Sequence, residues 1–262
     1  MKRVMITGAA GLVGGVLREQ LRSHYRLVLL DRGMVPDPQP LEEVVRCDIR
    51  DSGALDMAME GVDAVVHLAG EPTEAAWEAI RDANIEGLYR VVEAARGAGV
   101  RRFLFASTNH VVGYYPRTEA VGADSPPRPD TRYGVSKVFG EALLRLYADK
   151  FSLTAVCIRI GTLRRPDAPG SVRHLSTWVS HRDLGELVRC SIEADVQYEI
   201  VYGVSNNARR WWHDRAAERL GYRAVDDAEL FASILEAGPP SPADVVADGH
   251  QGGEYCSWER PR

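Results

Sequence analysis

The sequence predicts an α/β protein: a Rossmann-like, doubly wound parallel sheet with a small C-terminal cap. Short, continuously apolar segments alternate with helical patterns along most of the chain. Glycines stand between the first apolar segment and the first helical one, at Gly8, Gly11 and Gly14. Strands that are apolar on both sides are typical of a parallel sheet covered by helices on both faces. A chain of 262 residues has the length of one large α/β domain.

The elements are expected in a regular order. Strands are predicted at residues 4–7, 27–30, 43–48, 64–68, 102–107, 154–159 and 199–203. Helices are predicted at residues 12–23, 52–59, 73–97, from Tyr133 to about 151, and 180–193. Ser52 is expected to cap the second helix, and Ser180 and Asp183 have the spacing of a capping box. Residues 161–262 are expected to complete the sheet and form the cap, in one structural unit with the preceding part.

Composition and charge exclude several classes of protein. An apolar content of 45% and a charged content of 26% are those of an ordinary globular protein. The net charge of −5 argues against nucleic-acid binding. No apolar run approaches the roughly 20 residues that span a bilayer, and the N-terminal residues show no secretion signal. The cysteines have no metal-like spacing and are expected to be reduced and buried: Cys47, Cys157, Cys190 and Cys256. We therefore expect a cytoplasmic protein without nucleic-acid, membrane or metal partners.

The turn after the first strand has the pattern of a dinucleotide-binding loop. Small residues at Gly8, Gly11 and Gly14 let the backbone approach a pyrophosphate, and a helix N-terminus supplies N–H groups and positive potential. The spacing differs from the Gly-x-Gly-x-x-Gly of many NAD enzymes, and a tight turn without ligand is the alternative. Residues 1–160 are therefore expected to be the cofactor-binding core. The same cofactor is expected to contact Leu12, Val13, Leu68, Ala69, Gly70 and Asn84.

Two acidic residues at strand ends bear on the choice of cofactor. Asp31 ends the second strand, where a carboxylate accepts hydrogen bonds from ribose hydroxyls and repels a 2′-phosphate. This favours NAD over NADP, although Arg32 next to it could accept that phosphate. Asp48 and Ile49 follow the third strand and could hold the adenine. For Asp48, a role as a strand-ending turn residue is nearly as common.

Tyr133 and Lys137 stand four residues apart on one face of a predicted helix. A lysine beneath a tyrosine favours the phenolate over the phenol, whose reference pKa is about 10. A phenolate beside a nicotinamide can take the proton from an alcohol as hydride leaves carbon. Tyr-x-x-x-Lys alone recurs by chance on helices, but after a dinucleotide loop it predicts an oxidoreductase.

Polar side chains follow the fifth strand, at the edge where doubly wound sheets bind ligands. Thr108 could hydrogen-bond the reacting oxygen, and Asn109 and His110 could hold other substrate hydroxyls. A histidine by itself is more often a structural hydrogen-bonding residue, but its polar neighbours favour a direct role.

Two further residues leave alternatives open. Asn84 is a poor residue inside a helix, so it either faces solvent or holds a buried water near the site. Arg173, in the expected cap, could clamp a carboxylate through two parallel hydrogen bonds. From the sequence alone, a solvated loop arginine is the more common case.

These motifs together resemble the short-chain dehydrogenase/reductase superfamily in its extended, epimerase-like branch, over about residues 1–160. More specific segments are similar to the uronate dehydrogenases of that superfamily and extend the resemblance over nearly the whole chain. They are residues 105–116, the Tyr133 segment, Arg159-Ile-Gly-Thr162, Arg173-His-Leu-Ser-Thr-Trp178 and Gln251-Gly-Gly253.

The resemblance implies a role for several residues. Tyr133 would be the base, and Lys137 its support and a ligand of the cofactor ribose. Contacts to a sugar would come from Thr108, Asn109, His110, Thr162 and Arg173, with Tyr255 nearby. This chain departs from the pattern at four positions. Thr108 and Thr162 stand where serine is expected, Pro72 stands where a hydroxyl side chain is expected, and Tyr255 stands where phenylalanine is expected.

The activity that the resemblance implies is NAD-dependent oxidation of a hexuronic acid, such as glucuronate or galacturonate, at C1 to the aldarolactone. The partners would be this small-molecule substrate and other copies of the chain in a homo-oligomer. One alternative is a nucleotide-sugar epimerase, which would need a larger C-terminal domain. Another is a non-catalytic Rossmann module that senses NAD(P), although such modules commonly lack the tyrosine base.

Overall fold

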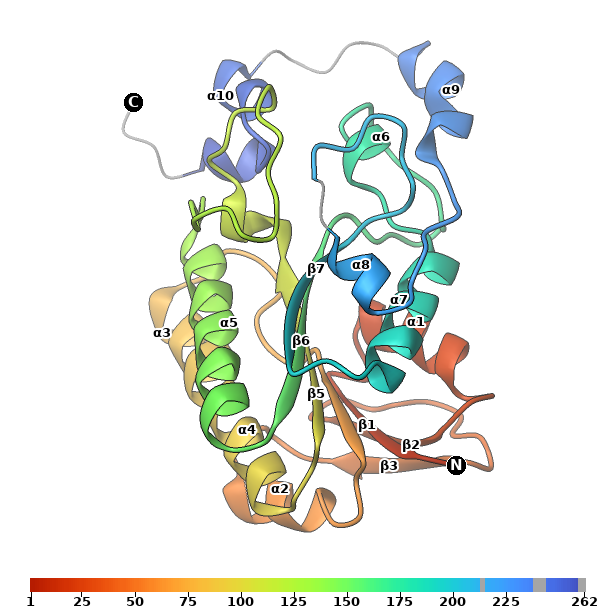
Figure 1. Cartoon of the computed structure of the whole chain (residues 1–262), viewed down its shortest axis with the longest axis vertical. Helices are drawn as coiled ribbons and strands as arrows, with labels where there is room; N and C mark the ends of the chain where they lie inside the picture. Colours follow the sequence, from red (N-terminus) through yellow and green to blue (C-terminus); the bar gives the residue numbers. More distant parts are fainter. Residues whose placement is uncertain (213–214, 238–243, 259–262) are drawn as a thin grey trace.

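A seven-stranded parallel sheet forms the centre of the molecule (Figure 1). The computed structural model describes residues 1–212, 215–237 and 244–258. The strands lie in the order β3-β2-β1-β4-β5-β6-β7. They are β1 Arg3–Thr7, β2 Arg26–Asp31, β3 Glu42–Arg46, β4 Ala64–His67, β5 Arg102–Thr108, β6 Thr154–Ile160 and β7 Tyr198–Gly203. The order reverses between β1 and β4, which makes this the switch point where doubly wound folds bind ligands.

Helices cover both faces of the sheet (Figure 1). One face carries α1 (Leu12–Leu21) and α7 (His181–Glu193), and the other carries α2 (Ser52–Ala58), α4 (Leu88–Gly97) and α5 (Arg132–Lys150). Alternate residues of β1 enter the two cores: Val4 and Ile6 pack on one side and Met5 on the other. Because both faces are buried, the strands are apolar without interruption, and the predicted fold class is confirmed.

The cap is built from short elements. They are α6 (His174–Thr177), α8 (Ala216–Arg219), η3 (Ala228–Phe231), α9 (Ala232–Glu236), α10 (Val245–Gly249) and η4 (Gly253–Cys256). Of these, α6, α9 and α10 stand above the sheet in Figure 1. The segment after α10 is tied to the loop after β5, because Gln251 N–H donates to Tyr115 O at 2.9 Å and Gly252 N–H donates to Gly113 O at 2.8 Å. Within the described residues, none of the helices has both the length and the apolar character needed to cross a bilayer.

All predicted strands and the five main helices are present, but two helix starts differ from the prediction. Asp51, not Ser52, caps α2, because its carboxylate accepts the Ala54 N–H at 3.1 Å. The helix predicted from residue 73 begins at Trp77 and is not uniform. It consists of α3 (Trp77–Ile80), the π-helical segment η1 (Arg81–Gly87) and α4.

Ser180 caps α7 as predicted, because its hydroxyl accepts the Asp183 N–H at 3.0 Å. The second half of the expected capping box is absent. The Asp183 carboxylate instead accepts the N–H groups of Val225 and Asp226, both at 3.0 Å, and so ties α7 to the chain before η3.

Candidate active site

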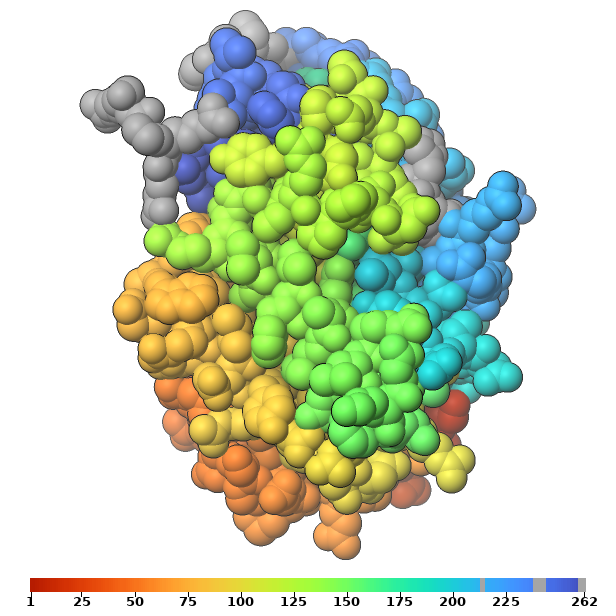
Figure 2. Space-filling model, turned by 60° about the vertical axis from the view of Figure 1, so that its left-hand side comes forward, coloured from red at the N-terminus to blue at the C-terminus, as the bar shows by residue number. Residues whose placement is uncertain are grey.

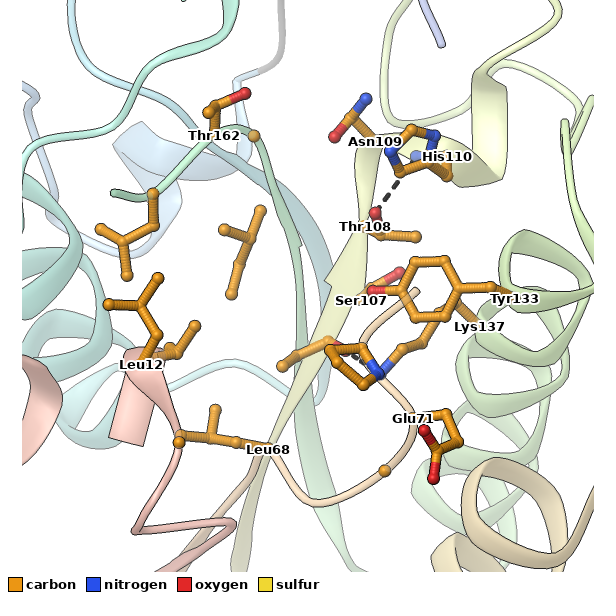
Figure 3. Close-up of a pocket in the computed structure, with 18 of the residues that line it drawn as sticks. Leu12, Leu68, Glu71, Ser107, Thr108, Asn109, His110, Tyr133, Lys137 and Thr162 are labelled. Atoms are coloured by element: carbon orange, nitrogen blue, oxygen red, sulfur yellow. Dashed lines mark hydrogen bonds between the residues drawn. The ribbon is translucent and has the colours of Figure 1, made fainter. Parts of the chain in front are cut away.

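A cavity of about 1850 Å³ opens at the carboxyl ends of the central strands and continues beneath the cap. It runs from the glycine loop at Gly8, past Tyr133 on α5, to Arg173 and Tyr255 in the cap. Every predicted site residue except Asn84 lines this cavity. Figure 3 shows its central part, with Tyr133 and Lys137 on one side and Leu12 and Leu68 on the other.

The glycine loop is shaped for close approach. Gly8 has φ +72°, and a Cβ there would lie 2.8 Å from the Ala69 nitrogen. A Cβ on Gly14 would lie 2.4 Å from the Gly8 carbonyl oxygen, so this glycine lets α1 pack on the loop. Gly11 is less constrained, with a closest approach of 3.3 Å. No side chain caps α1, so its first N–H groups are free to bind a pyrophosphate, and the loop fits NAD.

Asp31 is held at the cavity edge by its own turn. Its two carboxylate oxygens accept the N–H groups of Ala10 at 2.9 Å and Gly33 at 2.7 Å. Arg32 also lines the cavity. At the next strand end, Arg50 donates to both oxygens of Asp48, and this ion pair lowers the Asp48 pKa to about 2. Arg50 N–H also bonds Asp48 at 2.9 Å, which is the strand-ending turn considered as the alternative for this residue.

Tyr133 lies in the first turn of α5, which Thr131 caps by accepting the Gly134 N–H at 3.0 Å. Lys137 Nζ donates to the Ala106 carbonyl at 2.8 Å and lies 5.5 Å from the centre of the Tyr133 ring. Burial raises the pKa of Tyr133 well above its usual value, although a hydrogen bond with Thr108 opposes this. Burial also lowers the pKa of Lys137 to about 8. In the protein alone, the cost of burying the charged phenolate therefore outweighs any effect of the lysine on the Tyr133 pKa.

Thr108, the last residue of β5, and Asn109 and His110, which begin the short 3₁₀ helix η2 (Asn109–Val112), face the same cavity (Figure 3). The Thr108 hydroxyl accepts the His110 N–H at 3.3 Å. Asn109 is buried, and its amide nitrogen has no hydrogen-bond partner within the described part of the chain. His110 stacks on Tyr255 with ring centres 3.9 Å apart, and its Nδ1 lies 2.7 Å from the carboxylate of Asp130.

Asp130 was not predicted from the sequence. It is buried, its other oxygen accepts the Thr131 hydroxyl at 3.0 Å, and it fixes the His110 ring. A Cβ on Gly113 or Gly252 would lie 1.8 Å or 2.0 Å from its Oδ2, so both glycines are needed for this packing. Neither spacing nor periodicity signals the pair, because the histidine and the aspartate meet only through the loop after β5.

Arg173 enters the cavity from the start of α6. It donates to the Gln251 carbonyl and, at 3.4 Å, to the Thr177 hydroxyl, while its Nε has no partner among the described residues. Burial lowers its pKa to about 10, so it remains charged at neutral pH. No described carboxylate lies within ion-pair distance of its guanidinium. Arg173 is thus half-buried and hydrogen-bonded to the protein, which differs from the fully solvated loop arginine that is the commoner case on sequence grounds.

The four positions that depart from the family pattern all line the cavity. Thr162 shares a hydrogen bond of 2.8 Å with Thr177. The extra hydroxyl of Tyr255 lies 2.7 Å from the Thr73 hydroxyl, which follows Pro72 in the chain. The Thr73 hydroxyl thus binds the cap rather than lining the cavity.

Asn84 does not line the cavity, and its contact with the cofactor stays a prediction. It is buried rather than facing solvent. Its amide accepts the Glu71 N–H at 2.7 Å and donates to the Glu71 carbonyl at 3.1 Å and to the Ser136 hydroxyl at 3.0 Å. Asn84 thus connects the π-helical segment to α5 and to the chain after β4. A Cβ on Gly70 would lie 2.6 Å from its side-chain oxygen.

A doubly wound sheet with a glycine loop, and a cavity at the switch point lined by Tyr133 and Lys137, is the arrangement expected of an NAD-dependent oxidoreductase. Residues 4–215 match the NAD dependent epimerase/dehydratase family. A uronate dehydrogenase of Pseudomonas putida is 42% identical over 97% of this chain and 95% of its own. Crystal structures of uronate dehydrogenase from Agrobacterium tumefaciens, one of them a tyrosine-to-alanine variant complexed with NAD, superpose with a TM-score of 0.93. They are 41% identical over 98% of this chain and 97% of theirs.

The chain belongs to the uronate dehydrogenases of the NAD-dependent epimerase/dehydratase family. It is an NAD-dependent oxidoreductase, as the sequence predicts. A further relative is the NAD-dependent glucose-6-phosphate dehydrogenase of Haloferax volcanii, which is 40% identical over 87% of this chain and 95% of its own.

Proposed function

We propose that this protein oxidises a hexuronic acid, such as glucuronate or galacturonate, at C1 to the aldarolactone with NAD. The observation that carries the proposal is Arg173, a half-buried cation in the same cavity as Tyr133, with a buried, unpartnered Nε and no described carboxylate within ion-pair distance. A sugar carboxylate at Arg173 would supply the missing anion and occupy the free Nε–H. The unpartnered amide of Asn109 would bind a sugar hydroxyl of the same ligand.

In this proposal, some site residues bind the sugar and others take part in proton transfer. Arg173 holds the carboxylate end of the sugar, and Asn109 and His110 hold ring hydroxyls. Tyr133 accepts the proton of the anomeric hydroxyl, with the Thr108 hydroxyl sharing that hydrogen bond and lowering the phenol pKa. Proton transfer of this kind contributes typically 10²–10⁴-fold to a rate. NAD, held by the glycine loop, Asp31 and Lys137, supplies the hydride acceptor when bound.

Net formation of NADH with different sugars tests this function. We expect NADH with free glucuronate or galacturonate, and none with UDP-sugars or without sugar. A nucleotide-sugar epimerase would isomerise UDP-sugars without net NADH, and a cofactor sensor would bind NAD without turnover. Because one relative is named for a phosphorylated sugar, glucose 6-phosphate belongs in the panel. Absence of NADH with every uronate would overturn the proposal.

We also propose that the protein is a cytoplasmic homo-oligomer. The surfaces of α3–α4 and α5 adjoin on the face shown in Figure 2. They expose large apolar side chains, namely Trp77, Tyr89, Val135 and Leu146, which a second copy of the chain would cover. The four free, buried cysteines agree with a reducing compartment. Light scattering should give a mass above that of one chain, and Leu146→Glu should lower it.

A further inference from the structure

A second arginine lines the cavity near Arg173. Arg117 comes from the loop after β5 and donates to the carbonyls of Ala247 at 2.9 Å and His250 at 3.2 Å. The guanidinium groups of both arginines lie over the ring of Trp211, at 5.1 Å for Arg117 and 5.4 Å for Arg173. Both cations line the cavity and lie beside the same ring, Arg117 from the loop after β5 and Arg173 from the start of α6.

Nearby acids balance these two charges poorly. Asp248 lies 3.9 Å from Arg117, but its side chain is 63% exposed, so water screens the pair. Asp130 also attracts Arg173, but its oxygens are engaged with His110 and Thr131. Burial lowers the pKa of both arginines, and the charge of Arg117 adds to the lowering at Arg173. Glu254 also lines the cavity and attracts Arg173, but it is exposed. Among the described residues, this end of the cavity thus holds two partly desolvated cations and no buried acid free to neutralise them.

A single carboxylate would neutralise only one of these charges. A phosphate ester carries a charge of about −1.5 to −2 at pH 7 and has three acceptor oxygens, enough for two guanidinium groups. A hexose with phosphate at C6 carries it at the end of the sugar where a hexuronate has its carboxylate. C1 of both sugars would then meet Tyr133.

We propose that Arg117 and Arg173 form one anion-binding subsite that accepts a dianionic group, so that the cavity takes hexose 6-phosphates as well as hexuronates. This inference rests on the proposed function, because it assumes that the sugar lies with C1 at Tyr133. Arg117 would be the residue that distinguishes the dianion from the carboxylate, and Arg173 would contact both.

The test combines titration calorimetry in the presence of NAD with initial rates of NADH formation. The ligands are glucose 6-phosphate, glucuronate, glucose and inorganic phosphate. Arg117→Gln removes the charge but keeps a polar chain, and Arg117→Lys keeps the charge. Arg128→Gln is the matched control, because Arg128 also lies over an aromatic ring, 4.9 Å from that of Tyr115, but does not line the cavity.

We expect the wild-type protein to bind and oxidise glucose 6-phosphate better than glucose. Arg117→Gln should weaken the binding of glucose 6-phosphate by about 10-fold or more, while the affinity for glucuronate should change by less than about 3-fold. Arg117→Lys should recover part of the loss, and Arg128→Gln should behave as wild type. The inference fails if glucose 6-phosphate binds no better than glucose, or if inorganic phosphate binds as tightly as the sugar phosphate. It also fails if Arg117→Gln and Arg117→Lys reduce the affinities for glucose 6-phosphate and glucuronate by the same factor. Lack of glucuronate oxidation would instead reject the proposed function, and calorimetry would still measure the anion subsite.

Discussion

Burial opposes the charged form of both Tyr133 and Lys137, so the protein alone keeps the phenol protonated. Thr108 is the one described neighbour whose hydrogen bond lowers the Tyr133 pKa. In the proposed reaction, bound ligands would therefore have to lower the Tyr133 pKa before the tyrosine could accept a proton.

Tyr133→Phe removes the proposed proton acceptor and keeps the ring. NAD affinity should remain near that of the wild type, while kcat on glucuronate should fall by roughly 10² or more. Steady-state kinetics and NAD titration measure the two effects separately. Near-normal turnover in this variant would show that another group accepts the proton.

Arg173→Ala tests recognition of the carboxylate. Loss of a charge-assisted hydrogen bond worth about 1.5–3 kcal/mol should raise KM for glucuronate by roughly one to two decades. Any weak activity on glucose should change little, and Arg173→Lys should recover only part of the loss, because lysine cannot make the paired contact. Equal losses on the acid and the neutral sugar would make Arg173 a structural residue of the cap.

Asp31→Ala tests the choice of cofactor. The substitution removes both an acceptor for ribose hydroxyls and the charge that repels a 2′-phosphate. KM for NAD should rise, and the preference of the enzyme for NAD over NADP should become smaller. A wild-type enzyme that already prefers NADP would show that Arg32 governs this end of the cavity.

A site residue could be predicted from the sequence when the pattern that identifies it lies within one short segment. Tyr133 and Lys137 lie one helical turn apart, and Gly8 and Gly14 share one loop, so each pair can be recognised within one short segment, and the two patterns together predict the site. Asp130 and Arg117 acquire their roles from contacts with segments far along the chain. No pattern within one segment records such contacts.

At the scale of elements, the η4 segment and the loop after β4 are joined by one side-chain contact over the cavity. Tyr255 binds Thr73 at 2.7 Å and also stacks between His110 and Trp258, with ring centres 3.9 Å and 4.0 Å away. The hydroxyl contact fixes the ring that covers His110. It therefore couples the position of the cap to the hydroxyl-binding part of the site.

Thr73→Val and Tyr255→Phe each break this contact without removing the packing around it. Each should raise KM for glucuronate several-fold, at a cost of roughly 1 kcal/mol, with little change in kcat. The double variant should have the same KM for glucuronate as each single variant, because all three lose the same hydrogen bond. Additive effects in this cycle would show that the two hydroxyls act independently on the substrate.

The element boundaries show where sequence patterns reach their limit. Apolar strands and the long amphipathic helices are predicted well, because their burial repeats regularly along the chain. The interruption of the helix at Arg81–Gly87 was not predicted. It coincides with Asn84 bonding to Glu71 and Ser136, a tertiary contact that helical periodicity does not encode.

At the scale of the whole molecule, the sheet order follows from alternating strands and helices, whereas the cap does not. Its helices have four or five residues, too few for a hydrophobic period to be read. They are placed by buried polar contacts such as Gln251, whose amide donates to the carbonyls of Pro116 and Glu119 and accepts the Trp212 N–H at 2.7 Å. The sequence thus predicts the layered core but not the structure of the cap that covers the cavity.

Lys137 connects the site to the stability of the whole fold. Its pKa is about 8 in the folded protein and 10.5 for an unperturbed lysine, because burial disfavours the cation. Between these pH values the unfolded chain binds more protons than the folded one, so the free energy of unfolding rises with pH. Below about pH 8 both states are protonated and the folded protein carries the full cost of the buried charge.

Lys137→Met removes the titrating group and keeps most of the side-chain volume. The difference in unfolding free energy, wild type minus variant, should therefore become more positive as pH rises from about 8 towards 10. Urea denaturation of both proteins across this range measures it, and groups common to both, such as Tyr133, cancel in the difference. A difference that stays constant with pH would mean that Lys137 keeps an ordinary pKa, and that water or a neighbouring acceptor solvates its ammonium group in the folded state.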